Sequence, residues 1–365
     1  MPVANYRSLR EFDWTLLSVA LIISAVGVLQ IYSATHGTGW SDAWWRQCLY
    51  IAAGLLLMWL ASSVDYHTLL EQAPVYYGLS IVGLVAVLLL GKEVSGGKRW
   101  IPLPLGFHFQ VSEFVKVVLI LLIARYLSDL KGDHLEARDL LKLGALTALP
   151  AALVMKQPDL GTALSYVPIL AMGIFLAGLR WRHVVALLLI AALALPVGWS
   201  LLKDYQKMRL IAFLDPSRDP LGAGYQVIQS QIAVGAGGMW GKGVTQGSQT
   251  QLRFLPVPHT DFIFSAFAEE HGFVGVLVML GLYFLLLMQV VQNAQVAADR
   301  AGMYIAMGVA GLLLFHLLVN IGMVVGRMPV TGIPLPLMSH GGSSVLSWFI
   351  MLGLVNNVRL RRFAI

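Results

Sequence analysis

The chain has 365 residues, of which 58% are hydrophobic and only 12% are charged, and its formal net charge is +6 at pH 7. Its mean hydropathy is +0.74. This composition indicates a membrane protein with many spans, and it gives no reason to expect a nucleic-acid partner. The apolar runs lack the period-two alternation of a membrane barrel, so the spans are predicted to be helices. The single cysteine, Cys48, excludes an intrachain disulfide and a metal site shared between thiols.

Apolar runs long enough to cross a bilayer recur along the chain and predict about ten spanning helices. We therefore expect an all-α polytopic membrane protein, a single domain over residues 1–365, with a large extracytoplasmic loop at about residues 203–260. Arg7 and Arg10 before the first run resemble a signal peptide, but the apolar core exceeds the roughly 7 to 15 residues of a signal sequence, so this run is a retained span. We place the spans at Trp14 to Ile31, Trp45 to Ser63, Leu69 to Leu90, Val111 to Leu127, Leu140 to Met155, Thr162 to Gly178, Val184 to Leu202, Phe273 to Val291, Tyr304 to Val325 and Val345 to Val358.

Basic residues next to the spans orient the chain, because cytoplasmic loops carry an excess of lysine and arginine. One set of alternate loops contains Arg7, Arg10, Lys131, Arg138, Lys142, Arg180, Arg182, Arg300, Arg359, Arg361 and Arg362. This set, with both termini, is predicted to be cytoplasmic. The opposite set nevertheless contains Lys92, Lys98, Arg99, Lys156 and, in the long loop, Lys203, Lys207, Arg209, Arg218, Lys242 and Arg253. These residues indicate an anionic ligand on the outer face, although long loops are also translocated whatever their charge.

The long loop, from about Lys203 to Pro258, is rich in turn residues and glycine. Val227 to Ala233 is predicted to form a short amphipathic helix inside it. Glycines then flank Lys242, and such a loop can bring backbone N–H groups close to phosphate oxygens. No Gly-Lys-Ser/Thr follows a strand there, and no strand-to-helix unit surrounds it, so nucleotide binding is not expected.

The stretch Leu255 to Phe264 carries Asp261, the residue most strongly expected to do chemistry. Pro256 and Pro258 exclude a helix on the approach, and the carboxylate then stands at the edge of an apolar run. A charged side chain in that position is energetically costly, so it is expected to have a specific role. Thr260 or Asp261 could cap the next helix, or Asp261 could act chemically, and the residues alone leave both roles open.

Other charged residues also lie where charge is expensive. Glu113 and Lys116 open the fourth span at i and i+3, so they share a helix face and can pair, either to permit insertion or for direct catalysis. Asp159, in a tight outward turn, could cap the sixth span or face the same outer cavity as Asp261.

Two further carboxylates, Glu269 and Glu270, follow Asp261 on the same predicted helix. Viewed down the helix axis, Glu270 points away from Asp261, and Glu269 is rotated from it by about 80°. One of them is expected to be a structural partner for a basic group. No set of His, Cys and carboxylates has the spacing of a zinc site, so no metal ligand is assigned. The last outward loop, Gly326 to Ser344, has prolines and glycines at membrane depth and is expected to wall the site.

Several specific motifs are spread over nearly the whole chain. They are Gln157 to Thr162, Asp219 to Tyr225 with Gln229-Ser230, the Leu-Pro-x-x-His-Thr-Asp-Phe-Ile-Phe run, Ala268-Glu269-Glu270 with Gly272, Asn320 to Met323, and Gly332 to Ser344. Together they resemble the SEDS family of bacterial shape, elongation, division and sporulation proteins. The Gly-Ala-Gly-Tyr and Ser-Gln-Thr-Gln-Leu-Arg-Phe-Leu-Pro stretches are more similar to the elongation member than to the division member. His340 departs from the pattern, because the family usually has Tyr before Gly-Gly-Ser.

The resemblance implies a peptidoglycan glycosyltransferase of the bacterial cytoplasmic (inner) membrane, with an outward-facing site that polymerises lipid II. Lipid II is a disaccharide-pentapeptide on undecaprenyl diphosphate, so the leaving group is anionic. Asp261, in the family's His-Thr-Asp-Phe motif, would be the general base on the acceptor 4-hydroxyl, which attacks the anomeric carbon with inversion. Candidates for stabilising phosphate charge are Lys98, Arg99, Lys116 and Arg209. Further candidate substrate-binding residues are Glu113, Asp159, His259, Glu269 and Ser343.

The resemblance also implies a class B penicillin-binding protein as transpeptidase partner, alongside other proteins of the elongation complex. A divalent cation such as Mg or Mn is left open as a cofactor. Two other function classes stay open as well. A lipid II flippase would need polar groups along an inner as well as an outer path. A non-catalytic scaffold for a cell-wall synthase would need only the spans and an outer docking face.

Overall fold

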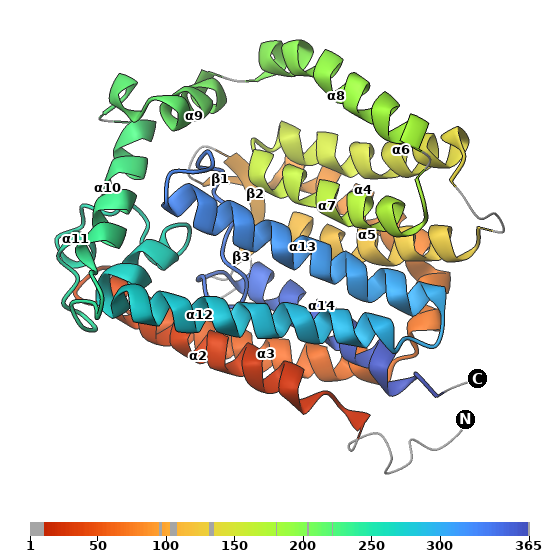
Figure 1. The fold of residues 1–365 in the computed structure, drawn as a ribbon, viewed down its shortest axis with the longest axis horizontal. Coiled ribbons are helices and arrows are strands. Elements are labelled where there is room, and N and C mark those ends of the chain that lie inside the picture. The colour runs from red at the N-terminus through yellow and green to blue at the C-terminus, as the bar shows by residue number, and fades with distance from the viewer. Residues whose placement is uncertain are drawn as a thin grey trace.

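Long helices carry the fold, and they occupy the positions of the predicted spans (Figure 1). The computed structural model describes residues 11–94, 97–102, 108–130, 135–179, 181–202, 204–220 and 222–363. The helices that match the spans are α2 (Trp14–Thr35), α3 (Ala43–Ser63), α4 (Tyr66–Leu90), α5 (Val111–Ser128), α6 (Ala137–Lys156), α7 (Leu160–Leu176), α8 (Trp181–Leu201), α12 (Ile263–Gln295), α13 (Arg300–Val324) and α14 (Gly342–Leu360). Within the described residues, α2, α4, α12, α13 and α14 are long and apolar enough to cross a membrane by length and composition alone. The all-α polytopic class is confirmed.

Aspartates define where several of these helices begin. Asp13, Asp65, Asp159 and Asp299 stand at the N-caps of α2, α4, α7 and α13. Each carboxylate accepts a backbone N–H of the first turn, at distances of 2.7 to 3.1 Å. A cap of this kind contributes about 1 kcal/mol. Several acidic residues of this apolar chain therefore have a structural role, which is to cap helices.

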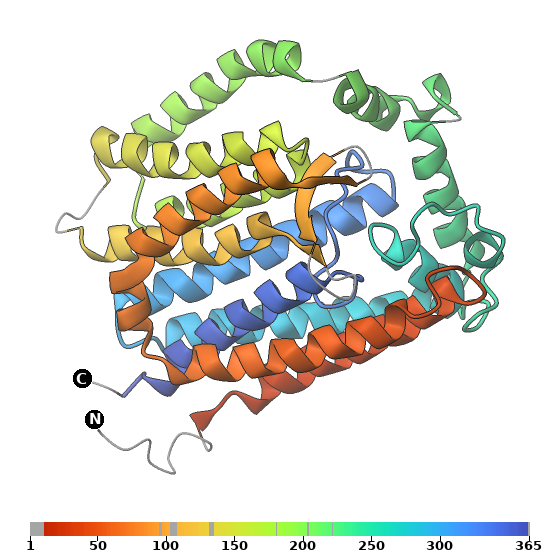
Figure 2. The same cartoon turned by 180° about the vertical axis from the view of Figure 1, so that it is seen from behind.

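The centre of the bundle is formed by α13 and α14. In these two spans 61% and 78% of the most apolar window is buried, against 22% in α4 and in α12. The helix α14 packs along α3, while α13 contacts α5, α7 and α12. Figure 2 shows the same arrangement from behind. A helix that is buried all round can carry polar residues only where they are hydrogen-bonded. The buried polar side chains of α13 are therefore expected to have hydrogen-bond partners.

The helix α12 is bent at Gly272, whose φ of 66° and ψ of −168° are not helical. The predicted span began at Phe273, directly after this bend, whereas the observed helix begins at Ile263. The sequence pattern missed the first part because Glu269 and Glu270 interrupt the apolar run there. Both side chains are buried and hydrogen-bonded, so the helix tolerates them.

A small antiparallel sheet, which the sequence analysis did not predict, lies between α4 and α5. Its strands are β1 (Lys92–Val94), β2 (Gly97–Pro102) and β3 (His108–Phe109), in the order β1-β2-β3. The register places Lys92 opposite Trp100, and Ile101 opposite Phe109. The sheet thereby holds Arg99 at the end of the bundle where α5 begins.

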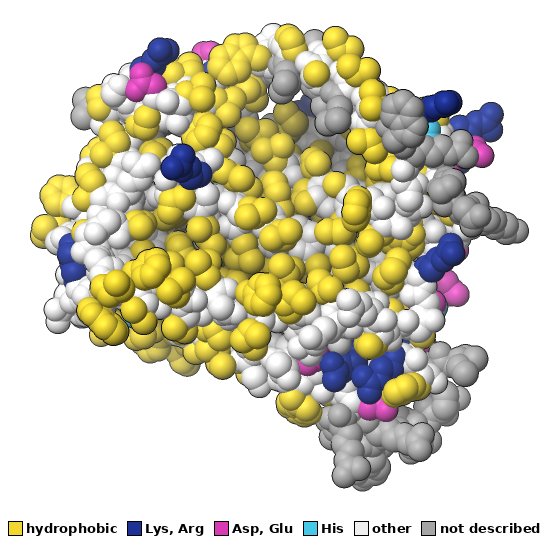
Figure 3. Space-filling view, in the orientation of Figure 1, with side chains coloured by type: hydrophobic (Ala, Val, Ile, Leu, Met, Phe, Trp, Pro, Cys, Tyr) yellow, Lys and Arg dark blue, Asp and Glu magenta, His cyan; other side chains and the backbone are white. Residues whose placement is uncertain are grey.

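The long loop contains α9 (Asp204–Leu214), the short helix η2 (Pro216–Arg218), α10 (Ala223–Ala236) and α11 (Ser248–Gln251). The amphipathic helix predicted at Val227 to Ala233 is confirmed and lies inside α10. Figures 1 and 2 both show α8 and α9 standing away from the other helices. Figure 3 shows a hollow below them that is lined largely by hydrophobic side chains.

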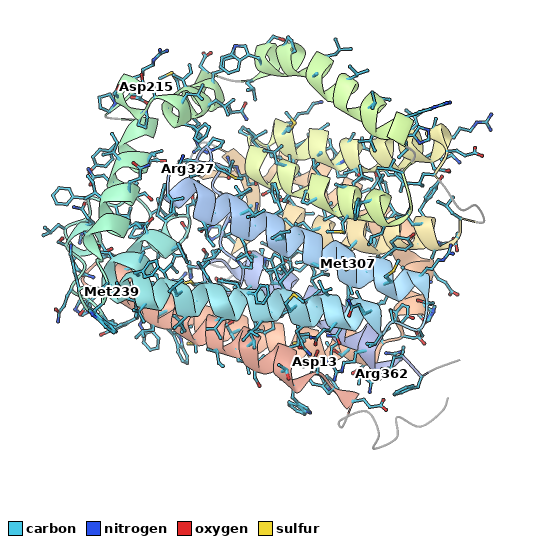
Figure 4. The ribbon with its side chains drawn as sticks, viewed as in Figure 1. Asp13, Asp215, Met239, Met307, Arg327 and Arg362 are labelled. Atoms are coloured by element: carbon cyan, nitrogen blue, oxygen red, sulfur yellow. The ribbon has the colours of Figure 1, made fainter. Side chains whose placement is uncertain are left out.

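The two ends of the bundle are distinct (Figure 4). Asp13 and Arg362 mark one end, called here the terminal end. Met239 and Arg327 mark the opposite end, called here the site end, where the loop helices and the sheet also lie. The terminal end places the beginning of α2 beside the end of α14, as the even number of spans predicts.

Candidate active site

Asp261 lies at the site end, in a segment without regular helix. Residues 255–262 form turns, Val257 has a φ of 43°, and α12 begins only at Ile263. Phe262 occupies the N-cap position of α12, and no side-chain cap is formed there. Asp261 is therefore not the N-cap of α12, and it differs in this from the four N-cap aspartates described above.

The backbone around Asp261 is fixed by buried polar side chains from two other elements. Asn320 of α13 donates from Nδ2 to the carbonyl oxygens of Asp261, at 3.1 Å, and Ile333, at 2.8 Å. The Ser339 hydroxyl donates to the carbonyl of Thr260 at 2.7 Å. These bonds tie the segment to the last outer loop. The prediction that this loop walls the site is consistent with this arrangement.

The loop approaches the Asp261 carboxylate at Gly332. A side chain built at Gly332, which has a φ of 74°, would place its Cβ 3.4 Å from Oδ2 of Asp261. On its other side the loop meets α7, because a Cβ at Gly161 would lie 2.7 Å from the carbonyl oxygen of Thr331. The loop thus contacts both the Asp261 carboxylate and the start of α7, where Asp159 lies.

Burial raises the pKa of Asp261, and the nearby charge of Asp159 raises it further. The guanidinium groups of Arg209 and Arg99 and a hydrogen bond from Thr260 act in the opposite direction. The carboxylate is therefore held in a poorly hydrated place with two cations in electrostatic range. A more basic carboxylate is a better proton acceptor.

Arg99 and Arg209 are both attached to backbone carbonyl groups near the site. Arg99 donates from Nε to Gln157 at 3.2 Å and from Nη2 to Pro158. Arg209 donates from Nη1 to the carbonyl of Val330 at 3.2 Å. These bonds orient the two guanidinium groups.

Asp159 fills the capping role, one of the two roles that the sequence left open. It accepts the N–H and the hydroxyl of Thr162, at 3.1 and 2.9 Å, and so caps α7. It also accepts from Nε2 of Gln110 at 3.0 Å and adds to the field at Asp261. Gln110 in turn donates its backbone N–H to the Ser343 hydroxyl at 2.8 Å. Asp159 and Ser343 therefore belong to one hydrogen-bonded network.

Glu113 and Lys116 form the predicted pair, with 2.7 Å between Oε1 and Nζ. Their side chains are 4% and 1% exposed, so the pair is inside the bundle. Ser347 of α14 donates to the second Glu113 oxygen at 3.4 Å. The Lys116 ammonium is thus paired with a carboxylate of its own helix. Contact of Lys116 with a substrate diphosphate stays a prediction.

Glu269 organises the glycine-rich part of the long loop. It is fully buried and accepts from Lys242 Nζ at 2.9 Å, from the backbone of Gln249 at 2.8 Å and from Thr250. The prediction that one of the two acids partners a basic group is confirmed for Glu269. Glu270 instead accepts from Ser33 at 2.5 Å and from Gln30, a role that the sequence analysis missed.

The glycine-rich loop also closes the bend of α12. The N–H groups of Lys242 and Gly243 donate to the carbonyls of Glu269 and Glu270, at 3.0 and 2.9 Å. These are carbonyls that the bend at Gly272 removes from the helix ladder. The two N–H groups therefore stabilise α12, and they do not form the phosphate cradle that the composition allowed.

His259 and Lys98 complete the predicted set. The ring of His259 lies 5.6 Å from that of Trp40 and 6.0 Å from that of His340. Burial lowers the pKa of His259, so the ring is neutral at pH 7. Lys98 contributes its backbone to β2 opposite Glu93, and its side chain lies outside the described residues.

Sequence reasoning assigned no role to Asn320, Gln110 or Ser339, all of which hold site segments in place. The available signal was a polar amide inside an apolar span, because such a group must find partners there. Among the described residues, no group of three or more His, Cys, Asp or Glu could hold a metal ion.

The fold and the site define a polytopic membrane protein that gathers a carboxylate and two guanidinium groups at one end of its bundle. A family model described as cell cycle protein, which covers FtsW, RodA and SpoVE, matches residues 11–362. The chain belongs to this family.

Two curated relatives are similar over nearly their whole length. The peptidoglycan glycosyltransferase MrdB of Escherichia coli (strain K12) is 40% identical, over 96% of this chain and 94% of the relative. The peptidoglycan glycosyltransferase RodA of Treponema pallidum (strain Nichols) is 35% identical, over 98% of this chain and 99% of the relative. The resemblance to the SEDS family, and within it to RodA, is confirmed.

Solved structures show the same fold. A structure described as the structural coordination of polymerization and crosslinking by a peptidoglycan synthase complex matches with a TM-score of 0.83 and 37% identity, over 97% of this chain and 99% of that chain. The rod shape determining protein RodA of Thermus thermophilus matches with a TM-score of 0.72 and 31% identity, over 97% of this chain and 98% of that chain.

Proposed function

We propose that the protein is a peptidoglycan glycosyltransferase that polymerises lipid II, with Asp261 as the general base. The relatives that share its whole length are named for this activity. The observation that carries the residue assignment is the position of Asp261. Its carboxylate caps no helix, its backbone is held by Asn320, and two arginines lie in electrostatic range.

In the proposed step Asp261 accepts the proton of the acceptor 4-hydroxyl as that oxygen attacks the anomeric carbon of the donor. The new glycosidic bond forms as the bond from the anomeric carbon to the diphosphate oxygen breaks. The electron pair of the broken bond leaves with undecaprenyl diphosphate, and the configuration inverts. A positioned base of this kind contributes roughly 10² to 10⁴ in rate.

Arg99 and Arg209, with Lys98, would stabilise the charge that develops on the diphosphate. Arg99 is anchored at the turn that precedes α7, and Arg209 is anchored on the last outer loop. The two guanidinium groups therefore approach Asp261 from different elements and are already oriented. Preorganised cations of this kind stabilise a transition state because they do not reorient during reaction.

The proposal includes an outward-facing site in the inner membrane, both termini in the cytoplasm, and a class B penicillin-binding protein that crosslinks the new strand during elongation. The alternation of basic loops supports the orientation. The similarity to a synthase complex that combines polymerization and crosslinking supports the partner.

The test is to incubate the purified protein in detergent with labelled lipid II, with and without the transpeptidase, and to resolve the products by gel electrophoresis. Glycan strands that require Asp261 are the expected result. Transbilayer movement of lipid II in liposomes without polymer would instead identify a flippase. Neither product nor movement would identify a scaffold.

A further inference from the structure

A row of four aromatic rings begins at the surface of the site end with Trp40 and includes His259 of the Asp261 segment. The ring centroids of Trp40 and His259 lie 5.6 Å apart, those of His259 and His340 lie 6.0 Å apart, and those of His340 and Tyr50 lie 6.0 Å apart. The planes of Trp40 and His259 are inclined by only 32°. Since His259 is two residues from Asp261, the row adjoins the proposed base.

Hydrogen bonds hold the Trp40 end of this row and link its two middle members. Thr38 accepts the N–H of Trp40 at 3.1 Å, and Arg253 donates to the carbonyl of Gly37 at 3.0 Å, so the turn that carries Trp40 is held in place. The N–H of His340 donates to the carbonyl of His259 at 2.9 Å. The row is therefore a built surface that connects the turn after α2, the Asp261 segment and the last outer loop.

Trp40 is the exposed end of the row. The Trp40 side chain is 59% exposed, whereas His259, His340 and Tyr50 are half-buried. An exposed indole fixed against a second ring is costly in water, because a tryptophan carries a large apolar area. Among the described residues Nδ1 of His340 has no hydrogen-bond partner. The row thus offers both an apolar face and an unsatisfied polar atom.

The row is uncharged at neutral pH. Burial lowers the pKa of His259, and burial with the neighbouring His259 and Arg46 lowers the pKa of His340 to about 4. Besides His259, the groups that face His340 are Asp42 and Arg46 at the start of α3, and these two form a 2.8 Å ion pair. Neutral rings with single N–H donors suit hydroxyl-bearing ligands better than phosphate.

We propose that Trp40, His259, His340 and Tyr50 form a stacking subsite for a pyranose ring of the growing glycan strand, with Trp40 as its outer platform. The apolar C–H face of a sugar ring packs on the negative face of an indole, as positive edges do in aromatic pairs. The platform lies in the turn after α2, outside the spanning helix, where a sugar rather than a lipid chain is expected. This inference rests on the proposed function, because it assigns a subsite for its product.

The direct test measures saccharide binding without turnover. The full chain carrying Asp261→Asn is mixed with a lipid-free GlcNAc–MurNAc tetrasaccharide, and saturation-transfer NMR is used to follow binding. Trp40→Ala in this background should weaken binding about three- to tenfold, while Trp40→Phe should retain most of it. Trp45→Ala is the matched control, because Trp45 is 55% exposed and its ring contact is with Trp44, outside the row. Equal binding by the Trp40→Ala and Trp45→Ala proteins overturns the subsite.

A second measurement distinguishes the growing strand from the donor lipid. With Asp261 intact and lipid II as substrate, Trp40→Ala should shorten the strands by a larger factor than it slows the first coupling. Strands of wild-type length with a slow first coupling would overturn the assignment to the strand. If the wild-type protein makes no polymer, the proposed function fails while the tetrasaccharide titration still decides the subsite. Unfolding temperature and gel filtration establish that each variant is folded.

Discussion

The charged groups at the two ends of the bundle are used in different ways. At the terminal end the carboxylates are closed by cations from other helices, with Asp13 paired to Arg359 at 3.3 Å and Asp65 paired to Arg361 at 3.4 Å. Asp13 also accepts from Gln289, at 2.9 Å. A carboxylate with all its lone pairs used joins helices and has no capacity left for chemistry.

At the site end Glu269 is likewise paired, with Lys242, but the charged groups around Asp261 are left open. Among the described residues no ion pair closes on Asp261, and Arg99 is attached to backbone carbonyls rather than to an acid. Charge that is oriented but not neutralised costs stability and is characteristic of functional sites. In this protein, whether a charged residue is structural or chemical therefore depends more on whether its charge is paired than on whether it is buried.

The largest effect is expected from Asp261→Asn. The amide keeps the shape of the side chain but cannot take a proton at neutral pH, so lipid II polymerisation should fall by about 10² to 10⁴. Because the folded state raises the pKa of Asp261, the ionised carboxylate costs stability at neutral pH, and the variant should unfold at the same or a higher temperature. Strand synthesis and thermal unfolding in one detergent measure the two quantities.

Asp13→Asn is the matched control from the terminal end. It should lower the unfolding temperature, because it breaks the bond to Arg359 and weakens those to the α12 amides. The rate per folded molecule should change little. Near-normal strand synthesis by the Asp261→Asn protein would show that Asp261, like Asp13, has only a structural role. The two ends of the bundle would then not differ in how they use their aspartates.

The next effect concerns Glu113 and Lys116, which lie in the first two turns of α5 and form an ion pair, as the terminal-end groups do. Glu113→Gln or Lys116→Met alone should cost about 3 to 5 kcal/mol, since each leaves a buried charge without its partner. The double variant should lose clearly less than the sum, which a double-mutant cycle of unfolding free energies measures. Strictly additive losses would show that the 2.7 Å contact contributes no coupling.

A smaller effect is expected from Arg99→Gln. If Arg99 contacts the diphosphate, its loss should cost about 1.5 to 3 kcal/mol, or roughly ten- to hundredfold in kcat/KM for lipid II. Arg361→Gln is the control, since Arg361 also donates to backbone carbonyls but lies at the terminal end. Equal kinetic losses in the two variants would show that Arg99 acts only through the fold.

The smallest effect is a shift in pH dependence. The active form of the general base is the carboxylate, so activity should fall as pH drops through the pKa of Asp261, which lies above the ordinary value of 3.8. Arg209→Gln removes a cation that lowers this pKa, so the acid limb of the kcat/KM profile should move to higher pH. An acid limb that does not move would separate Arg209 from the base.

The helices and the strongest chemical candidate could be predicted from the sequence because their signals are local. Apolar length marks a span, two prolines exclude a helix before Asp261, and the i, i+3 spacing pairs Glu113 with Lys116. Each of these signals lies within a few residues of the feature that it predicts.

The missing features depend on contacts between distant segments. The sheet needs pairing of short strands that alone have little propensity, and the bend at Gly272 needs the loop that completes its hydrogen bonds. Asn320 is recognisable as a polar residue in a span, but its two acceptors lie on other segments of the chain. The set of residues around Asp261 therefore required the tertiary structure.

The interlocking of the bend in α12 with the glycine-rich loop has an evolutionary consequence. A Cβ at Gly272 would lie 2.2 Å from the backbone nitrogen of Gly241, and one at Gly237 would lie 2.0 Å from the carbonyl oxygen of Ala268. Neither backbone can move away while the other keeps its hydrogen bonds. Positions 237, 241 and 272 should therefore be inherited as one unit, so that descendants of this chain keep all three glycines or replace the loop and the bend together.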